Sequence, residues 1–210
     1  MIRAFIADDH PVVRAGIKQI LAEAPDIELC GEAESGQEVL DKLAHCKPDV
    51  LILDIAMPGR NGVETLKRVS DSYPDVAVII LSMYPEDQYA LRLLKSGASG
   101  YLTKECATDQ LASAVRRVAR GKKYISPALA EILADSITGH GDQPAHQELS
   151  NREYQIFCLL ASGRRVSEIA EELSLSVKTI STYRTRILRK MHMTKNAELT
   201  YYAIKNNLVE

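Results

Sequence analysis

The chain lacks several features that mark the more specialised classes of protein. No apolar run approaches the roughly 18 to 20 residues that a bilayer span requires; residues 76–81, one of the longest, number only six. Two acids, at positions 8 and 9, stand where an export signal would still be apolar. The four cysteines are scattered without a C-x-x-C pair, which argues against a zinc site, a redox motif or a disulfide scaffold. These absences predict a cytoplasmic protein with no membrane partner.

What is present is the composition of an ordinary folded protein. Its 210 residues are 46% hydrophobic and 26% charged, a length that suits one large or two modest domains. The net charge of −2 conceals a gradient. Residues 1–125 hold 16 basic and 18 acidic groups, residues 126–148 hold no basic and four acidic groups, and residues 149–210 hold 10 and 6. The basic end is expected to be a separate unit with a polyanionic partner, although a solvated helix face would carry similar charge.

Strand and helix patterns alternate through the first 121 residues. Short runs rich in Ile, Val and Leu predict strands at 2–7, 27–32, 49–53, 76–81 and 99–103. Helical patterns lie between and after them, at 11–24, 36–44, 62–72, 86–95 and 107–120. Because the strands are apolar almost throughout, they predict a parallel sheet buried by helices on both faces. Right-handed crossovers then give a doubly wound α/β fold, whose ligands bind beyond the carboxyl ends of the strands.

Polar residues stand where these strands end. Asp8 and Asp9 follow the first strand, Asp54 ends the third, Ser82 ends the fourth and Lys104 follows the fifth. Crowded carboxylates repel one another, and Mg²⁺ relieves that repulsion. A cation and a lysine in one pocket suit a phosphoryl group, with Asp54 as the nucleophile and Ser82 as a hydrogen-bond donor. Taken singly, the acids would serve as helix caps and the lysine would lie on the surface; together they predict an aspartyl phosphate.

The motifs that contain these residues resemble the receiver domains of two-component response regulators. They read ADDHP at 7–11, LDIAMPGRNG at 53–62, LS at 81–82 and GASGYLTK at 97–104, and the match covers residues 1–121. The resemblance implies a flavodoxin-like five-stranded sheet of order 2-1-3-4-5. It also implies that Asp54 accepts phosphate from a sensor histidine kinase. Mg²⁺ would be bound by Asp9, Asp54 and the backbone carbonyl of Ala56, with Asp8 acting mainly through water.

The same resemblance implies a conformational switch, in which Ser82 moves toward the phosphoryl group and Tyr101 turns inward. From the residues alone, Tyr101 would be a partly buried strand aromatic whose hydroxyl finds water. One position departs from the family pattern: Glu105 stands where many receivers have a proline, often after a cis peptide. Because a non-prolyl cis bond costs about 3 to 4 kcal/mol, the geometry of the Lys104–Glu105 peptide stays open.

Residues 122–148 are expected to link this domain to a second one. Ser126 and Pro127 predict the start of a short helix through residue 137. Residues 139–147 lack apolar periodicity and predict a flexible tether in which His140 and His146 are solvated. A capping box at 150–153 opens a helix to residue 162, and helices at 166–173 and 177–191 follow, joined by the turn 174–176. Residues 149–210 therefore predict a small all-α helix-turn-helix domain.

The third of these helices has an apolar and a polar face. At 100° per residue, Ile180, Ile187 and Met191 lie within about 20° of one line and should face the core. The other face mixes hydroxyls with cations, as in a recognition helix that lies in the major groove of DNA. The alternative is a helical bundle that docks on protein, but residues 178–195 hold six cations and no acid. We expect DNA contacts from Lys178, Thr179, Ser181, Thr182, Arg184, Thr185, Arg186 and Arg189.

Residues 149–208 resemble the LuxR-type helix-turn-helix, through LSNRE at 149–153, EIA at 168–170, LS at 175–176, KTISTY at 178–183 and AEL at 197–199. The two resemblances in this order are typical of NarL/FixJ response regulators. They imply a transcription regulator, not an enzyme, that binds double-stranded DNA and forms a homodimer when phosphorylated. Ser181 and Tyr183 replace a lysine and a histidine common in that class, which leaves the preferred DNA sequence open.

Two other functions stay open at this point. One is a DNA-binding regulator whose receiver only docks protein and is never phosphorylated. The other is a Mg²⁺-dependent phosphohydrolase, although such enzymes usually place D-x-D after the first strand, whereas Asp54 follows the third.

Overall fold

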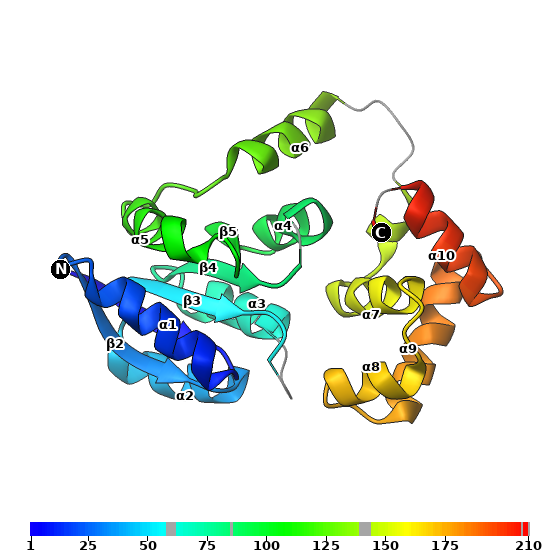
Figure 1. Ribbon diagram of the computed structural model, residues 1–210, viewed down its shortest axis with the longest axis horizontal. Coiled ribbons are helices and arrows are strands. Elements are labelled where there is room, and N and C mark those ends of the chain that lie inside the picture. Colours follow the sequence, from blue (N-terminus) through cyan, green and yellow to red (C-terminus); the bar gives the residue numbers. More distant parts are fainter. Residues whose placement is uncertain (58–61, 85, 139–143, 207, 210) are drawn as a thin grey trace. The chain divides into compact units, whose positions relative to one another are not determined.

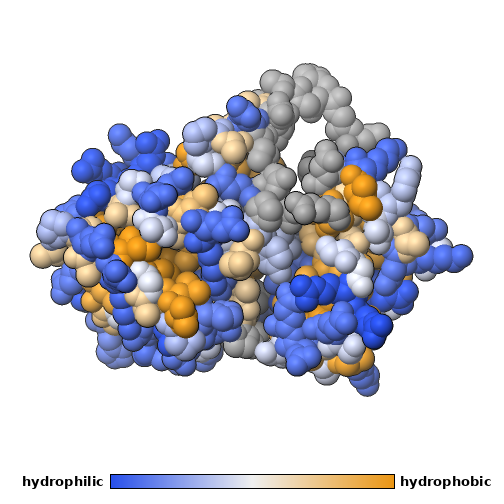
Figure 2. Space-filling model, in the orientation of Figure 1, coloured by the Kyte–Doolittle hydropathy of each residue, from blue (hydrophilic) through white to orange (hydrophobic). Residues whose placement is uncertain are grey.

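The computed structural model describes residues 1–57, 62–84, 86–138, 144–206 and 208–209 (Figure 1). The chain divides into two compact units, Met1–Thr138 and Gly139–Glu210, and each is described by itself. No helix in the described part of the chain has the length and apolar character needed to cross a membrane. Hydrophilic side chains cover most of the visible face of each unit, with smaller apolar patches between them (Figure 2).

The first unit is built on a five-stranded parallel sheet in the order β2-β1-β3-β4-β5. This finding confirms the predicted doubly wound fold. The observed strand bounds differ from the predicted ones by one residue at most. The strands are β1 Ile2–Ala7, β2 Ile27–Ala33, β3 Val50–Asp54, β4 Ala77–Ser82 and β5 Gly100–Thr103.

Helices cover both faces of this sheet. On one face, Ile6 and Ile52 of the sheet form a core cluster with Ile17 of α1 and Leu111 of α5. The alternate strand residues, such as Leu53, are buried as well, because α2, α3 and α4 cover the opposite face (Figure 1). The strands are apolar at nearly every position for this reason. The helices are α1 Pro11–Ala22, α2 Gly36–Cys46, α3 Gly62–Ser72, α4 Glu86–Lys95 and α5 Ala107–Val118.

Ser35 and Glu38, at the start of α2, have the spacing of a capping box, which forms only in part. Ser35 Oγ accepts a hydrogen bond from the Glu38 amide at 3.3 Å. The Glu38 carboxylate, however, accepts from the amide of Glu34 at 2.7 Å rather than from that of Ser35. The motif still satisfies two backbone donors at the helix start, but one of them lies a residue further upstream.

A sixth helix, α6 Pro127–Thr138, follows α5 and belongs to the first unit. Ser126 Oγ accepts from the Leu129 amide at 3.1 Å, which confirms the predicted cap, and it also donates to the Glu86 carboxylate of α4. Helix α6 lies in the segment expected to be a linker, and it contacts α4. Residues 139–143, the first part of the expected tether, lie outside the described residues.

In its described residues, the second unit is a bundle of four helices preceded by a 3₁₀ turn, η1 Ala145–Glu148. Ser150 and Glu153 form both hydrogen bonds of the predicted capping box. Three helices lie where the sequence predicts them, but α10 was not predicted as a helix. They are α7 Asn151–Ala161, α8 Val166–Glu172, α9 Val177–Lys190 and α10 Asn196–Lys205.

Candidate functional site

The carboxyl ends of β1 and β3 bring two buried acids together. Ala7 pairs with Leu53 in the register of these neighbouring strands, so the next residues, Asp8 and Asp54, emerge at the same level. Each of their side chains is only 1% exposed. Asp9 follows Asp8 and is 26% exposed. The structure therefore gathers the three carboxylates that the sequence placed at strand ends.

Lys104 reaches these acids from the end of β5. Its amide donates to the Ser82 carbonyl at 2.8 Å, which extends the pairing of β4 and β5 by one residue. Its Nζ lies 2.7 Å from Asp54 Oδ2 and 2.8 Å from Asp8 Oδ2. The single positive charge of Lys104 therefore pairs with two buried carboxylates, and it can neutralise only one of their two negative charges.

This crowding changes the acidity of the groups. Burial raises the pKa of Asp54 above its usual value; the Lys104 ammonium opposes the rise and the Asp8 carboxylate adds to it. For Lys104, burial acts to lower the pKa, but the Asp54 carboxylate outweighs burial and the pKa is raised. Loss of hydration and unlike charges explain both directions. The result is a poorly solvated carboxylate held beside a firmly protonated ammonium.

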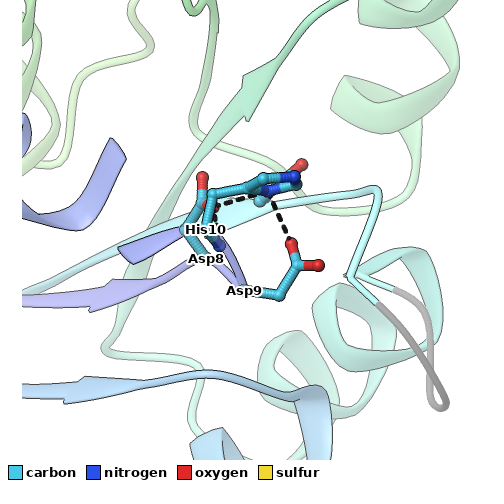
Figure 3. Close-up of side chains that lie close together, drawn as sticks. Asp8, Asp9 and His10 are labelled. Carbon is cyan, nitrogen blue, oxygen red and sulfur yellow. Dashed lines mark hydrogen bonds and ion pairs between the residues drawn. The ribbon is translucent and has the colours of Figure 1, made fainter. Parts of the chain in front are cut away.

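The donor set suits a divalent cation. Asp8, Asp9, His10 and Asp54 each offer one ligand atom, and these atoms all lie within 4.8 Å of one another. Asp9 Oδ1 is buried and accepts no hydrogen bond from the described residues, although His10 Nδ1 lies 3.0 Å away; Asp8 Oδ2 is buried as well and pairs with Lys104. Three carboxylates are the oxygen donors that Mg²⁺ prefers. Figure 3 shows that His10 lies beside Asp8 and Asp9. The sequence analysis did not identify His10 as a residue of the site.

Ser82 and Tyr101 both bond to the backbone of Tyr84. Ser82 Oγ accepts from the Tyr84 amide at 3.0 Å, and Tyr101 Oη donates to the Tyr84 carbonyl at 2.7 Å. Both side chains are fully buried. The expectation from the residues alone, that Tyr101 is partly buried and bonded to water, is therefore wrong: its ring points inward and its hydroxyl bonds to the backbone.

The backbone around Asp54 is tightly packed. The Ala56 amide donates to Asp54 Oδ1 at 2.8 Å, which keeps Ala56 beside the carboxylate. A Cβ on Gly62 would lie 2.2 Å from the Asp54 carbonyl oxygen, so only glycine fits where α3 begins. Residues 58–61 of the receiver-like motif lie outside the described part of the chain. No described peptide bond is cis, so the Lys104–Glu105 peptide is trans.

Arg14 bonds to the backbone of the site, at Asp8. It is buried on α1, where its Nη1 donates to the Asp8 carbonyl at 2.7 Å. Its Nη2 pairs with Glu34, and its Nε lies 3.4 Å from Glu32 Oε2. Sequence reasoning missed this residue, but a signal was present, since Arg14 shares the buried face of α1 with Ile17 at a spacing of i, i+3.

In the second unit, α9 has the two faces that the sequence predicts. Ile180, Ile187 and Met191 are buried, at 3% exposure or less. Thr179 and Arg184 are half-buried: Thr179 donates its amide to the Ser176 cap at 3.0 Å, and Arg184 bonds to an asparagine of α10. Six of the eight expected DNA contacts are exposed, namely Lys178, Ser181, Thr182, Thr185, Arg186 and Arg189.

One cation of the basic run has an acidic partner after all. Lys190 Nζ lies 2.6 Å from Glu153 Oε2, on α7. Burial acts to raise the pKa of Glu153, but hydrogen bonds from Lys190 and Ser150 hold it below its usual value. The sequence analysis therefore overestimated the unpaired positive charge of residues 178–195, because the acid that pairs with Lys190 lies 37 residues away in the sequence.

His146 is half-buried and packs against aromatic side chains of this unit. Its Nδ1 lies 3.0 Å from Tyr202 Oη. The centroid of its ring lies 5.9 Å from those of Tyr154 and Tyr202, tilted relative to the first ring and edge-on to the second. The expectation that His146 is solvated is therefore wrong, while His140 lies outside the described residues. Aromatic packing of this kind anchors η1 against α7 and α10.

Comparisons with known proteins match both units. Residues 4–116 match the family model of the response regulator receiver domain, and residues 147–203 match that of the bacterial regulatory proteins of the luxR family. The response regulator GacA of Pseudomonas protegens is 39% identical over 211 residues, which cover 100% of this chain and 99% of GacA. The oxygen regulatory protein NreC of Staphylococcus carnosus is 38% identical, with 100% of both chains covered.

A solved structure is also similar to this chain. RcsB from Salmonella enterica serovar Typhimurium, bound to promoter rprA in the presence of the phosphomimetic BeF3−, aligns with a TM-score of 0.65 and 26% identity. The alignment covers 96% of this chain and 97% of that one.

Proposed function

Since this chain belongs to the response regulators that join a receiver domain to a LuxR-type DNA-binding domain, we propose that Asp54 is the residue that accepts the phosphoryl group. The protein is a phosphorylation-controlled DNA-binding regulator. The observation that carries the assignment to Asp54 is the Lys104 ammonium, bonded at once to Asp54 and Asp8. Asp8 shares the burial and the ammonium, but Asp54 is the one that ends β3, the middle strand of the sheet.

The transfer forms one bond and breaks another. An Asp54 carboxylate oxygen attacks the phosphorus of a phosphohistidine on a sensor histidine kinase, and the bond from phosphorus to the imidazole nitrogen breaks. The imidazole leaves with that electron pair, and Asp54 becomes an acyl phosphate. Lys104 compensates charge on the transferred oxygens, and the Ala56 amide orients the carboxylate through Oδ1.

Magnesium would be held by Asp9, Asp54 and the backbone carbonyl of Ala56, with Asp8 acting through water. Bound there, it would neutralise charge on the phosphoryl oxygens. The support for this assignment is the cluster of carboxylate oxygens and the buried Asp9 Oδ1, which accepts no hydrogen bond from the described residues.

The response to phosphorylation would pass through Ser82 and Tyr101. A phosphoryl group on Asp54 offers Ser82 a stronger acceptor than its present position provides, since charged acceptors make stronger hydrogen bonds. Ser82 would then release the Tyr84 amide, to which it is bonded now. The surface around α4 and β5 would change in consequence and favour a homodimer.

Helix α9 would bind promoter DNA. Its exposed face carries Lys178, Arg186 and Arg189 among hydroxyl side chains, which suits phosphates and base edges in the major groove. Arg184 would contribute less, because Asn196 Oδ1 accepts from its Nε at 2.6 Å. A homodimer would place two such helices on paired half-sites.

The test compares Asp54→Asn with Asp75→Asn, a change of an exposed acid before β4. Each full-length protein is incubated with acetyl phosphate and Mg²⁺, its acyl phosphate is measured by mass spectrometry, and its binding to promoter DNA by gel shift. The wild type and Asp75→Asn should gain one phosphoryl group and bind DNA more tightly, whereas Asp54→Asn should do neither. Phosphorylation of Asp54→Asn would contradict the assignment. DNA binding by a wild type that forms no acyl phosphate would instead favour a receiver that only docks protein.

A further inference from the structure

Helix α6 is attached to the rest of the first unit through little buried surface. Among its described side chains only Leu129 is buried, and Leu133, one turn further on, is half-buried. The helix contacts α4. An element with few buried apolar contacts detaches from a domain at a low cost in free energy, so a single polar contact has a large influence on whether α6 stays docked.

Ser126 makes such a polar contact. Its side chain is buried, and its Oγ accepts from the Leu129 amide at 3.1 Å, at the start of α6. The hydroxyl proton is donated to the carboxylate of Glu86, the first residue of α4. One hydroxyl can do both, because it is a donor and an acceptor at once. The starts of α4 and α6 are therefore joined through one side chain, and the bond to the charged acceptor is the stronger kind.

Glu86 follows closely on the segment that the proposed function sets in motion. Two residues before it, the backbone of Tyr84 is bonded to Ser82 and to Tyr101. Loss of the hydrogen bond between the Tyr84 amide and Ser82 Oγ would loosen the chain that leads into α4. The Glu86 carboxylate would then move with it, because it stands in the first turn of that helix.

The chain just before α6 is held by other contacts. The amide of Tyr124 donates to the Ser99 carbonyl at 2.8 Å, and its hydroxyl donates to Gln110 Oε1 of α5 at 2.8 Å. Neither contact involves α4. A movement of Glu86 would therefore break its bond to Ser126 and leave the anchor at Tyr124 in place.

We infer that the hydrogen bond between Ser126 and Glu86 keeps α6 docked on α4 while Asp54 is unphosphorylated, and that phosphorylation breaks this bond and releases the helix. The inference rests on the proposed function, in which the phosphoryl group on Asp54 draws Ser82 away from Tyr84. Helix α6 ends at residue 138 and the DNA-binding unit begins at residue 139. Its release would add 12 residues to the free chain between the units, and a longer free chain lets two DNA-binding domains reach paired half-sites.

The alternative explanation is that this hydrogen bond only stabilises the fold. In that case the bond persists after phosphorylation, and the amides of α6 are protected from hydrogen exchange equally in both states. The two explanations also differ for Glu86→Ala, which removes the acceptor but leaves Ser126 to cap α6. A bond that only stabilises the fold would leave the response of this variant to phosphorylation intact.

The experiment measures amide hydrogen exchange of α6 by mass spectrometry in the full chain, with and without acetyl phosphate and Mg²⁺. Glu86→Ala is compared with Glu131→Ala, which removes an exposed carboxylate from α6 itself. A second variant, Ser126→Asp, keeps an acceptor for the helix cap and places a like charge beside Glu86. Acyl phosphate on Asp54 and binding to promoter DNA are measured in the same samples, and circular dichroism checks that each variant is folded.

In the wild type and Glu131→Ala, phosphorylation should speed the exchange of α6 by about tenfold or more. In Glu86→Ala and Ser126→Asp, exchange should be as fast without the phosphodonor, and the unphosphorylated variants should bind DNA more tightly than the unphosphorylated wild type. Slow α6 exchange in unphosphorylated Glu86→Ala would overturn the inference. A wild type that is phosphorylated on Asp54 with unchanged α6 exchange would overturn it and leave the proposed function standing, whereas a wild type that forms no acyl phosphate would overturn both.

Discussion

Replacing Gly62 by alanine tests how closely the start of α3 supports Asp54. A Cβ at this position would lie 2.2 Å from the Asp54 carbonyl oxygen and 2.5 Å from the Ile55 Cα. Both are backbone atoms, so no side-chain rotation relieves the clash, and either α3 or the end of β3 must shift. Overpacking costs about 1 to 3 kcal/mol, which for a unit of this size lowers the melting temperature by roughly 3 to 10 °C.

Thermal unfolding of the full chain measures this cost, and acetyl phosphate labelling shows whether Asp54 has moved. Gly16, in the middle of α1, provides the matched control, since nothing lies within 4 Å of its added Cβ. Gly16→Ala should stabilise the protein by about 0.5 to 1 kcal/mol and leave labelling as it is. If Gly62→Ala melted at the wild-type temperature and were labelled at the wild-type rate, the steric reasoning would be refuted.

Hydrogen bonds from Lys190 and Ser150 hold the pKa of Glu153 below its usual value, so the ionised group stabilises the fold at neutral pH and this contribution is lost as the pH falls through the folded-state pKa. Glu153→Gln should therefore be less stable than the wild type at pH 7, and its stability should depend less on acid, as measured by urea denaturation. Coincident pH profiles of the two proteins would contradict this. Tyr101→Phe removes a buried hydrogen bond to Tyr84 and should cost about 1 kcal/mol in the same assay; an unchanged midpoint would count against it. Arg186→Ala should reduce the slope of log affinity against log salt by about one in fluorescence anisotropy with duplex DNA, whereas Lys67→Ala, an exposed cation on α3, should leave the slope unchanged; equal slopes for both variants would exclude a phosphate contact at Arg186.

The strands and most helices could be predicted because each depends on a local pattern. Val50–Asp54 is apolar at four of five positions and buried at all five, and Ser150 and Glu153 form their capping box within one turn. Helix α10 was missed because its apolar face is narrow: Leu199 and Ala203 are buried, while Tyr201 and Ile204 are largely exposed.

Contacts between distant segments were harder to predict. The convergence of Asp8, Asp54 and Lys104 followed from the rule that parallel strands end at one edge. No such rule relates Lys190 to Glu153, since that pair depends on how α7 and α9 cross. His10 was overlooked for another reason: the sequence places it beside two acids, but only coordinates reveal that its ring turns toward both of them.

The two hydrogen bonds to Tyr84 tie together both ends of the expected switch. The Tyr84 amide donates to Ser82 and the Tyr84 carbonyl accepts from Tyr101. The segment after β4 is therefore hydrogen-bonded to side chains of two neighbouring strands. A rotation of the Ser82 hydroxyl away from Tyr84 would break the first of these hydrogen bonds and leave the one from Tyr101 in place. If Ser82 and Tyr101 are coupled as proposed, the main chain of Tyr84 would be one link between them, and a substitution confined to the Tyr84 ring would leave that link in place.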